Sequence, residues 1–307
     1  MKSGRPRVCV AGSFVVDLVF RVKRRPGPGE TMLADGFGMF LGGKGLNQAV
    51  GARRLGADVC IVGRVGRDAF GDMFLARLTQ EGIDSSYVTR DPEAGTAIAS
   101  PVVDEKGQNS IIAAPRANMQ VATRDVDAAT DAIAAADILM LQFEIPVGAS
   151  RRAAEIAHKH GTLVLLDPAP VEHGFERFDA PVDYMVPNEI EAHMLTGRLT
   201  PEEAAAVLLP ETRLGVVVSL GADGALAMDR ATSKRFPAHK VEVVDTTGAG
   251  DAFRAGLAMK IAEGARLDDA VRFANACGAL ACTVMGAEPS MPSRLTVQEF
   301  MEDRARP

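Results

Sequence analysis

Short apolar runs alternate with amphipathic stretches along most of the chain, and this alternation limits the possible folds more than any other feature. Several of the apolar runs are unbroken, which is typical of strands buried on both faces of a sheet. The strand-like runs are RVCVAG (7–12), DVCIVGRVG (58–66), DILMLQF (137–143), TLVLLDPAP (162–170), DYMVPN (183–188) and LGVVVSLG (214–221).

Amphipathic stretches lie between these runs and predict helices. The expected helices cover residues 45–55, 69–80, 124–135, 147–160 and 188–196. Strands that alternate with helices favour an α/β fold in which a mostly parallel sheet carries helices on both faces. A chain of 307 residues can form this as one large domain, so we expect a single domain over 1–307.

Two regions interrupt the alternation within the first 120 residues. Residues 14–41 contain two short strand-like runs around a Pro/Gly-rich turn, and residues 96–115 read as a β-hairpin with a polar turn. We expect these segments to pair into a small separate sheet that stands off the main one as a lid.

The composition disfavours several classes of partner. A net charge of −6 makes nucleic acid and anionic membranes poor partners. No segment reaches the ~18 uninterrupted apolar residues of a membrane span. Four cysteines (Cys9, Cys60, Cys277 and Cys282) lie in apolar contexts without a C-x-x-C pair. This pattern predicts buried thiols, no zinc site and a cytoplasmic setting.

The stretch DTTGAGDAFRAGL (245–257) predicts an anion-binding turn that leads into an apolar helix. Gly248 and Gly250 remove side chains there, and the first turn of a helix leaves backbone N–H groups without intrahelical partners. Such a turn is a ready site for phosphate. Asp251 would repel a phosphate, so its presence favours a chemical task for the carboxylate beside the anion.

Two other glycine turns allow a purely structural interpretation. FLGGKGLNQAV (40–50) lacks the GxxxxGK[ST] spacing of a P-loop, and by itself it can be a helix-entry turn. SLGADGALAM (219–228) reads as a hairpin that needs no ligand. The first strand also lacks GxGxxG, which disfavours a nicotinamide dinucleotide.

Two acidic positions are open to more than one interpretation. Asn188 and Glu191 have the spacing of a helix capping box. Glu144 follows the strand DILMLQF, at the edge where ligands bind in open parallel sheets. Its carboxylate is either a solvated loop group or a ligand contact.

Taken together, these segments resemble the ribokinase-like (PfkB) family of sugar and nucleoside kinases. GGKGLNQA and VDTTGAGDAFRAG carry the resemblance most specifically, and LQFEIP, DPAP, VPNEIEA and SLGADG follow in the family's order. The similarity spans essentially the whole chain. It implies transfer of the γ-phosphoryl group of ATP to a sugar hydroxyl, with Mg²⁺ and a monovalent cation, K⁺, as cofactors.

The resemblance also implies roles for individual residues. Asp251 is the expected general base, and Gly248, Ala249 and Gly250 would donate backbone N–H groups to the transferring phosphoryl group. The expected sugar contacts are Asp17, Gly43, Lys44, Asn47 and Glu144. The lid is expected to close over the sugar and to pair two subunits into a homodimer.

The nucleotide and cation sites follow from the same resemblance. Glu191, with Asn188, is expected to hold Mg²⁺ through water beside the ATP phosphates. The other expected ATP contacts are Ser219, Gly221, Gly224, Gly250 and Asn275. The expected ligands of the monovalent cation are Asp245, Thr247, Ala281, Val284, Gly286 and Ser290.

Two positions depart from the family pattern and leave the substrate open. Val15 replaces an asparagine that usually stands two positions before the lid aspartate, so either a hydrogen bond to a sugar hydroxyl is lost or an apolar part of the ligand meets Val15. Arg116 stands where relatives carry a small residue, and it is either a solvated charge or a contact to an anionic or hydroxyl-rich substrate. The first hypothesis is a kinase of ribose or a related pentose. The alternatives are a nucleoside kinase and a non-catalytic sugar- or nucleotide-binding regulator.

Overall fold

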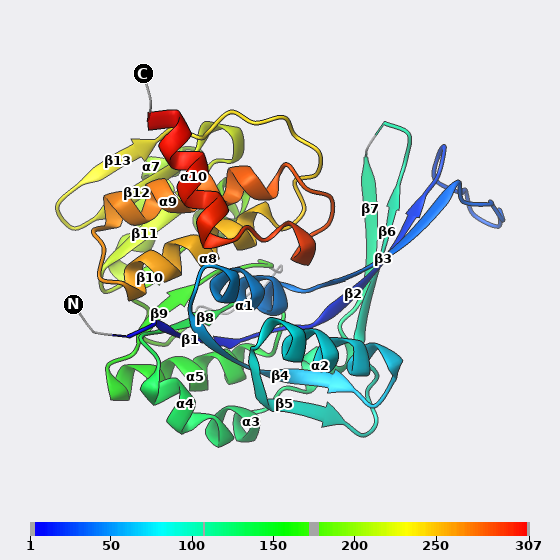
Figure 1. Cartoon of the computed structure of the whole chain (residues 1–307), viewed down its shortest axis with the longest axis horizontal. Coiled ribbons are helices and arrows are strands. Elements are labelled where there is room, and N and C mark those ends of the chain that lie inside the picture. The colour runs from blue at the N-terminus through cyan, green and yellow to red at the C-terminus, as the bar shows by residue number, and fades with distance from the viewer. Residues whose placement is uncertain (1–3, 107, 172–177, 306–307) are drawn as a thin grey trace.

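A large sheet runs through the molecule, as the alternation predicts (Figure 1). The computed structural model describes residues 4–106, 108–171 and 178–305, and within them this sheet has nine strands. Seven neighbouring strands are parallel, and the last two add an antiparallel edge. In spatial order the strands are β13 (Ser233–Phe236), β12 (Ala225–Asp229), β11 (Gly215–Ser219), β10 (Tyr184–Met185), β9 (Leu163–Leu166), β8 (Ile138–Leu141), β1 (Arg7–Ala11), β4 (Asp58–Gly66) and β5 (Asp84–Asp91).

The central strands are buried on both faces. Successive side chains of a strand point to opposite faces, and β1 shows this clearly. Val8 and Val10 join one hydrophobic cluster, whereas Cys9 and Ala11 join the other. The unbroken apolar runs therefore reflect two cores, one on each side of the sheet.

Helices cover both faces of the sheet, which confirms the predicted fold class (Figure 1). The helices that pack against the first cluster are α1 (Lys44–Arg54), α2 (Ala69–Glu81), α8 (Ala249–Ala262), α9 (Leu267–Ala281) and α10 (Arg294–Ala305). Those that pack against the second are α3 (Thr123–Ala128), α4 (Thr130–Ala135), α5 (Val147–His160), α6 (Glu189–Thr196) and α7 (Pro201–Leu208).

The helix predicted over residues 124–135 is not continuous, and this prediction is wrong. The stretch 124–135 forms two short helices, α3 and α4, instead of one. The break falls at Ala129, whose backbone has φ −96° and ψ 10°. The Thr130 hydroxyl donates to the carbonyl of Asp127 at 2.7 Å, so a side chain takes an acceptor near the end of α3.

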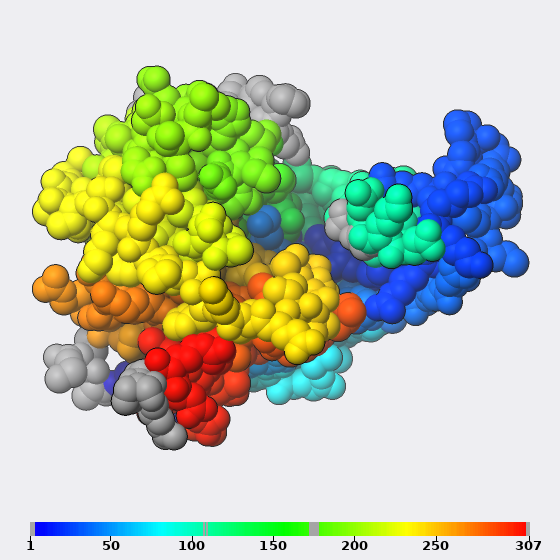
Figure 2. All heavy atoms as spheres, turned by 90° about the horizontal axis from the view of Figure 1, so that it is seen from above, coloured from blue at the N-terminus to red at the C-terminus, as the bar shows by residue number. Residues whose placement is uncertain are grey.

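The two interrupting regions form a separate four-stranded sheet. Its strands, in spatial order, are β3 (Gly36–Gly42), β2 (Val15–Arg21), β6 (Ala97–Val103) and β7 (Asn109–Ala114). β2 pairs with β3 and β6 with β7 in antiparallel fashion, and the parallel pairing of β2 with β6 joins the two hairpins. The sheet projects from one end of the body, in blue and teal in Figure 2. We call it the lid sheet.

Two glycines let α1 approach its neighbours closely. A Cβ on Gly45 would lie 2.3 Å from the backbone nitrogen of Ser13, so this part of α1 packs directly on the chain that leaves β1. A Cβ on Gly51 would lie 2.7 Å from the Cβ of Ala255, so α1 also packs tightly against α8. The first contact fixes the first turn of α1 at the carboxyl end of β1, and the second fixes the later part of α1 against α8.

The described parts of the chain contain no helix that is long and apolar enough to cross a membrane. All four cysteines are free thiols, and Cys9 and Cys277 are buried.

A matched pair of alanine substitutions tests the Gly45 contact. Gly45 and Gly148 both lie in the first turn of a helix, but a Cβ on Gly148 would meet no atom within 4 Å. We expect Gly148→Ala to raise the free energy of unfolding by ~0.5–1 kcal/mol. Gly45→Ala should lower it by ~1–3 kcal/mol, because the backbone after β1 must shift. Urea denaturation measures both, and equal stabilisation by the two variants would contradict the close contact.

Candidate active site

The carboxyl ends of β1 and β8 meet the start of α1. Glu144, beyond β8, accepts a hydrogen bond from the backbone N–H of Lys44 at 2.9 Å and another from the hydroxyl of Ser13. Leu46 donates its backbone N–H to the carbonyl of Ser13 at 3.0 Å. Glu144 therefore caps the GGKG turn from the strand edge at which ligands bind in parallel sheets.

Asp251, in the first turn of α8, is 6% exposed and faces α1. Its Oδ2 accepts a hydrogen bond from Asn47 Nδ2 at 2.9 Å, and its Oδ1 accepts one from Gln48 Nε2 at 3.0 Å. The structure thus brings the expected base together with the expected sugar ligand Asn47. The Oδ1 atom of Asn47 is buried without a hydrogen-bond partner among the described residues, so it leaves an acceptor beside the carboxylate.

A second buried carboxylate, Asp167, lies behind Asp251 at the end of β9. Its Oδ2 accepts from Gln48 Nε2 at 3.1 Å and from Lys44 Nζ at 3.4 Å, and its Oδ1 lies 3.0 Å from Nη2 of Arg254. Burial raises the pKa of Asp167 to about 6, although Arg254 and Lys44 act in the opposite direction.

Lys44 stays charged in this setting. Burial alone would lower the pKa of its ammonium group, but the negative charges of Asp167 and Asp251 outweigh burial and raise the pKa above its ordinary value. Lys44 is therefore a fixed cation between the two carboxylates and Glu144.

The lid sheet contributes Asp17 to the same end of the molecule. Val15 and Asp17 alternate with Val16, which is fully buried in the core, so these two side chains share the opposite face of β2. Burial, together with the nearby charge of Glu144, raises the pKa of Asp17 to about 6. Four of the five expected sugar contacts, namely Asp17, Lys44, Asn47 and Glu144, are thus linked to one another directly or through Asp251 and Asp167.

The start of α8 has the features of an anion site. Gly248 takes the N-cap position in the left-handed region, at φ 80°, and no side chain caps the helix. By contrast, Asp68 caps α2 and Asn188 caps α6. The N–H of Ala249 donates to the carbonyl of Thr246 at 3.2 Å, inside the turn. The helix N-terminus is therefore open to a ligand.

The expected nucleotide residues lie on the strands and loops beside α8. Asn188 and Glu191 form the predicted capping box, with bonds of 2.8 and 2.7 Å, and Asn188 bridges to Ser219 at the end of β11. Gly221 and Gly224 have positive φ values of 56° and 93° in the turn before β12. These conformations explain why the SLGADG turn requires glycine.

Asn275, on α9, is used internally. Its Nδ2 donates to the carbonyls of Phe236 and Pro237 at 3.2 and 3.1 Å. This side chain therefore holds the segment that follows β13, and its contact with adenine stays a prediction.

Three of the expected ligands of the monovalent cation meet where the loop before α8 contacts the segment between α9 and α10. Asp245 Oδ1 accepts from the N–H and the hydroxyl of Thr247 at 2.9 and 2.7 Å, and its Oδ2 accepts from the N–H of Gly286 at 2.9 Å. Burial would raise the pKa of Asp245, but these hydrogen bonds lower it below its ordinary value. The other three expected ligands, Ala281, Val284 and Ser290, belong to the neighbouring segment between α9 and α10 or to its ends.

A family model described as pfkB family carbohydrate kinase matches residues 5–294. The chain belongs to this family. The resemblance that the GGKGLNQA and VDTTGAGDAFRAG motifs carry is thus confirmed, and the chain is a carbohydrate kinase.

Individual relatives agree with this assignment. A ribokinase from Haemophilus influenzae is 35% identical over 303 residues, which cover 97% of this chain and 99% of the relative. A deoxyribokinase from Salmonella typhi is 33% identical over 301 residues, which cover 96% and 97% of the two chains. The structure of an Arabidopsis thaliana ribokinase complexed with ribose and ATP has a TM-score of 0.89 and 32% identity, with coverage of 97% and 99%.

Arg116, which the sequence leaves open as a solvated charge or a substrate contact of this kinase, packs elsewhere in the structure. It is exposed, has φ 38°, and donates from Nη1 to the carbonyl of Thr96 at 3.1 Å. A Cβ on Gly95 would overlap its guanidinium group. Arg116 therefore packs on the segment before β6, and a contact with substrate stays a prediction.

Four residues of the site were not singled out from the sequence: Gln48, Gln142, Asp167 and Arg254. Gln142 donates from Nε2 to the side-chain carbonyl of Gln48 at 2.6 Å, which turns the amide nitrogen of Gln48 toward both carboxylates. Asp167 follows a buried strand in the same way as Glu144, so the strand-end rule could have found it. Arg254 has no comparable signal of its own.

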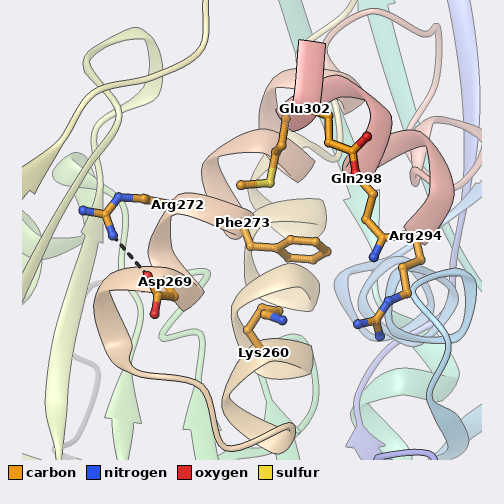
Figure 3. A pocket seen from close by; sticks show the side chains of 8 residues that line it. Lys260, Asp269, Arg272, Phe273, Arg294, Gln298 and Glu302 are labelled. Atoms are coloured by element: carbon orange, nitrogen blue, oxygen red, sulfur yellow. Dashed lines mark hydrogen bonds and ion pairs between the residues drawn. The ribbon is translucent and has the colours of Figure 1, made fainter. Parts of the chain in front are cut away.

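A separate pocket of about 320 Å³ lies at the other end of α8, between α8, α9 and α10 (Figure 3). Lys260, Arg272 and Arg294 line it, and each is already paired with an acidic residue: Glu263 with Lys260 and Arg294, and Asp269 with Arg272. These neutralised charges distinguish the pocket from the site at the start of α8.

The raised pKa of Asp17 gives a stability test. The unfolded carboxyl has a pKa near 3.8, so between that value and about 6 the folded protein binds more protons than the unfolded one. The stabilisation from protonated Asp17 is therefore present at low pH and lost as the pH rises through 6. We expect Asp17→Asn to raise the free energy of unfolding at pH 8 by ~1–3 kcal/mol, and to change it little at pH 4.

Urea denaturation at both pH values, with Asp35→Asn as a control, measures this difference. Asp35 is an exposed residue that precedes β3 of the same lid sheet. A stability gain from Asp17→Asn that is equal at pH 4 and pH 8, or matched by Asp35→Asn, would contradict the assigned environment of Asp17.

Proposed function

We propose that this carbohydrate kinase transfers the γ-phosphoryl group of ATP to a hydroxyl of ribose or a closely related pentose, with Asp251 as the general base. One observation carries the assignment of the base. The carboxylate of Asp251 lies buried between the amide of Asn47 and the uncapped first turn of α8. A sugar hydroxyl bound at Asn47 would meet the base on one side and the phosphoryl group on the other.

The chemistry follows from this placement. Asp251 takes the proton of the attacking hydroxyl as the sugar oxygen bonds to the γ-phosphorus, and the bond to the β-phosphate oxygen breaks to release ADP. Backbone N–H groups of Gly248, Ala249 and Gly250 would face the negative charge of the transferring group. The two amides that bind Asp251 keep its carboxylate oriented toward the hydroxyl.

The sugar is placed by groups from both sheets. Lys44, Asn47 and Glu144 belong to the large sheet and α1, whereas Asp17 comes from the lid sheet, and Gly43 joins the two at φ 92°. Closing the lid would bring these groups around the sugar and exclude water. The ribose and ATP of the Arabidopsis thaliana complex support a pentose here.

Mg²⁺ fits the oxygen ligands beside α8. Glu191 and Asp167 both pair with Nη2 of Arg254 there, and hard divalent cations prefer carboxylate and water oxygens. Glu191, with Asn188, would hold the ion through water, and the ion would shield the phosphate charges.

The residues also permit a monovalent cation, K⁺, at Asp245 and Thr247, where a carboxylate is already ordered by backbone donors. Comparing turnover in potassium with turnover in tetramethylammonium tests that site.

Two further proposals concern the assembly and its setting. The lid sheet exposes large apolar side chains, which would be covered if two subunits paired through this sheet. They are Phe37, Met39, Ile111 and Ile112. Light scattering on the parent and on Ile112→Asp distinguishes a dimer through the lid from a monomer. The free thiols and the use of ATP favour the cytoplasm.

A non-catalytic regulator is the less favoured function, because a pure binder does not require an oriented base. Asp251→Asn keeps the shape of the side chain and one acceptor oxygen but removes the base. We expect kcat to fall by ~10²–10⁴, the usual contribution of positioned proton transfer. Binding of ATP should change little. ADP release at saturating sugar and isothermal titration with ATP measure the two effects, and turnover like that of the parent would refute the base.

The apolar side chain of Val15 favours a sugar that lacks one hydroxyl. Its apolar side chain shares a face with Asp17, and a buried sugar hydroxyl left unpaired there costs ~1–3 kcal/mol. Relatives include both ribokinases and deoxyribokinases. We expect kcat/KM for 2-deoxyribose to equal or exceed that for ribose, and Val15→Asn to shift the ratio toward ribose by ~5–100-fold.

A panel of ribose, 2-deoxyribose, other pentoses, hexoses and nucleosides measures this preference as ADP release. Val19→Asn places the same substitution farther along the same face of β2 and should leave the ratio unchanged. Nucleosides that outperform every free sugar would instead establish the nucleoside kinase.

A further inference from the structure

Arg254 lies in α8 just after the turn that faces the transferring phosphoryl group, and its side chain is almost completely buried. A helical side chain points back toward the N-terminus of its own helix. The guanidinium group accordingly lies over Gly250, where a Cβ would come within 2.6 Å of Nη1. The sequence shows only that Gly250 removes a side chain from the turn, and the structure adds that this absence makes room for the guanidinium group.

This position is unfavourable for a cation by itself. Burial removes the hydration of the charge, and the positive end of the helix dipole lies nearby. Burial alone would lower the pKa of Arg254, but the charges of Asp167 and Glu191 outweigh it and raise the pKa. The two carboxylates therefore keep a permanent positive charge at the start of α8.

The contacts of the guanidinium group leave one nitrogen free. Nε donates to the carbonyl of Val186 at 3.1 Å, and Nη2 donates to Glu191 at 3.3 Å and lies 3.0 Å from Asp167. Every hydrogen bond and ion pair that Arg254 makes with a described residue runs from Nε or Nη2, whereas Nη1 sits against Gly250 at the uncapped first turn. An arginine carries five N–H donors in a fixed fork, so Nη1 can bind a second anion while Nη2 stays on the carboxylates.

We propose that Nη1 of Arg254 donates to a non-bridging oxygen of the transferring phosphoryl group. α8 then offers that anion a guanidinium group in addition to its backbone N–H groups. The inference rests on the proposed function, because it needs the phosphoryl group to lie at the start of α8. A fixed cation there stabilises the negative charge of the transferring phosphoryl group. Because the guanidinium group is already in place, no free energy is spent on reorienting it during the reaction.

The central experiment compares two buried arginines. Arg64, near the carboxyl end of β4, is also buried between two carboxylates, but its partners are Asp91 and Asp125, neither of which belongs to the site. Arg254→Gln and Arg64→Gln should both lower stability, since each leaves buried carboxylates without their cation. At temperatures where both variants are folded, we expect kcat to fall by ~10²–10³ for Arg254→Gln, and by less than about threefold for Arg64→Gln.

Arg254→Lys keeps the proposal testable if Arg254→Gln does not fold. Lysine retains the charge opposite Asp167 and Glu191 but lacks the fork that reaches two anions. We expect a folded protein whose kcat is reduced at least ~10-fold. A kcat within about threefold of the parent in either folded variant would overturn the inference.

A second measurement separates contact from a merely structural role. With sugar and Mg²⁺ present, ADP plus aluminium fluoride mimics the group in transfer, and the parent should bind it more tightly than ADP. Arg254→Gln should lose most of that difference while its affinity for ADP stays the same. If Arg254 only held Glu191, saturating Mg²⁺ would restore kcat and the difference would persist, and the inference would be wrong.

The parent protein decides the proposed function independently. Absence of sugar-dependent ADP release from the parent would refute that function. An active parent with unaffected Arg254 variants would refute the arginine contact alone.

Discussion

The active site depends on one side-chain amide that joins its two buried carboxylates. Gln48 Nε2 donates to Asp251 at 3.0 Å and to Asp167 at 3.1 Å, while its carbonyl oxygen accepts from Gln142. Both hydrogens of one nitrogen are thus used, and the amide cannot turn without leaving a buried group unpaired. The orientation of the base therefore depends on β8, β9, α1 and α8 keeping their relative positions.

Close packing of the backbone holds α1 and its neighbours in their relative positions. Gly45 brings α1 onto the chain after β1, and Gly51 brings it onto Ala255 of α8. Because neither contact leaves space for a methyl group, the helices that carry Asn47 and Asp251 have little freedom to slide. The lid sheet is held differently, through the Asn118 side chain, which bonds both backbone groups of Phe14 just before β2. The proposed base and phosphoryl site thus lie on the closely packed part of the fold, whereas Val15 and Asp17, which would discriminate between sugars, lie on the separate sheet.

Most of this fold could be predicted from the sequence because its strands are buried on both faces. Each of the six strand-like runs became a strand of the large sheet, and the residues around the two interrupting turns became the lid sheet. Local sequence patterns did not predict features that depend on contacts with another part of the chain. The helix over 124–135 breaks at Ala129, and the parallel pairing of β2 with β6 joins segments that no turn connects.

The same limit applies to the site residues. Asp251 and Asn47 stand out because their motifs are distinctive. In the structure Asn47 Nδ2 lies 2.9 Å from Asp251 Oδ2. The importance of Gln142 and Arg254 comes only from what folds against them, since glutamine after a strand and arginine in an apolar helix have many uses. Gly250 shows the difference most clearly. Its sequence context indicates only a turn without a side chain, whereas the position of Arg254 explains what occupies the space that the missing side chain leaves.

The charge balance of the site constrains how it can receive a nucleotide. Burial raises the pKa values of Asp17 and Asp167 to about 6, and nearby carboxylates contribute to both shifts. The carboxylates near the reacting groups outnumber the cations: they are Asp17, Glu144, Asp167, Glu191 and Asp251, against Lys44 and Arg254. A polyphosphate entering alone would be repelled, so it must arrive with its own cation. Cations that approach with the nucleotide would in turn favour the ionised carboxylates, which couples metal-nucleotide binding to proton release from this cluster.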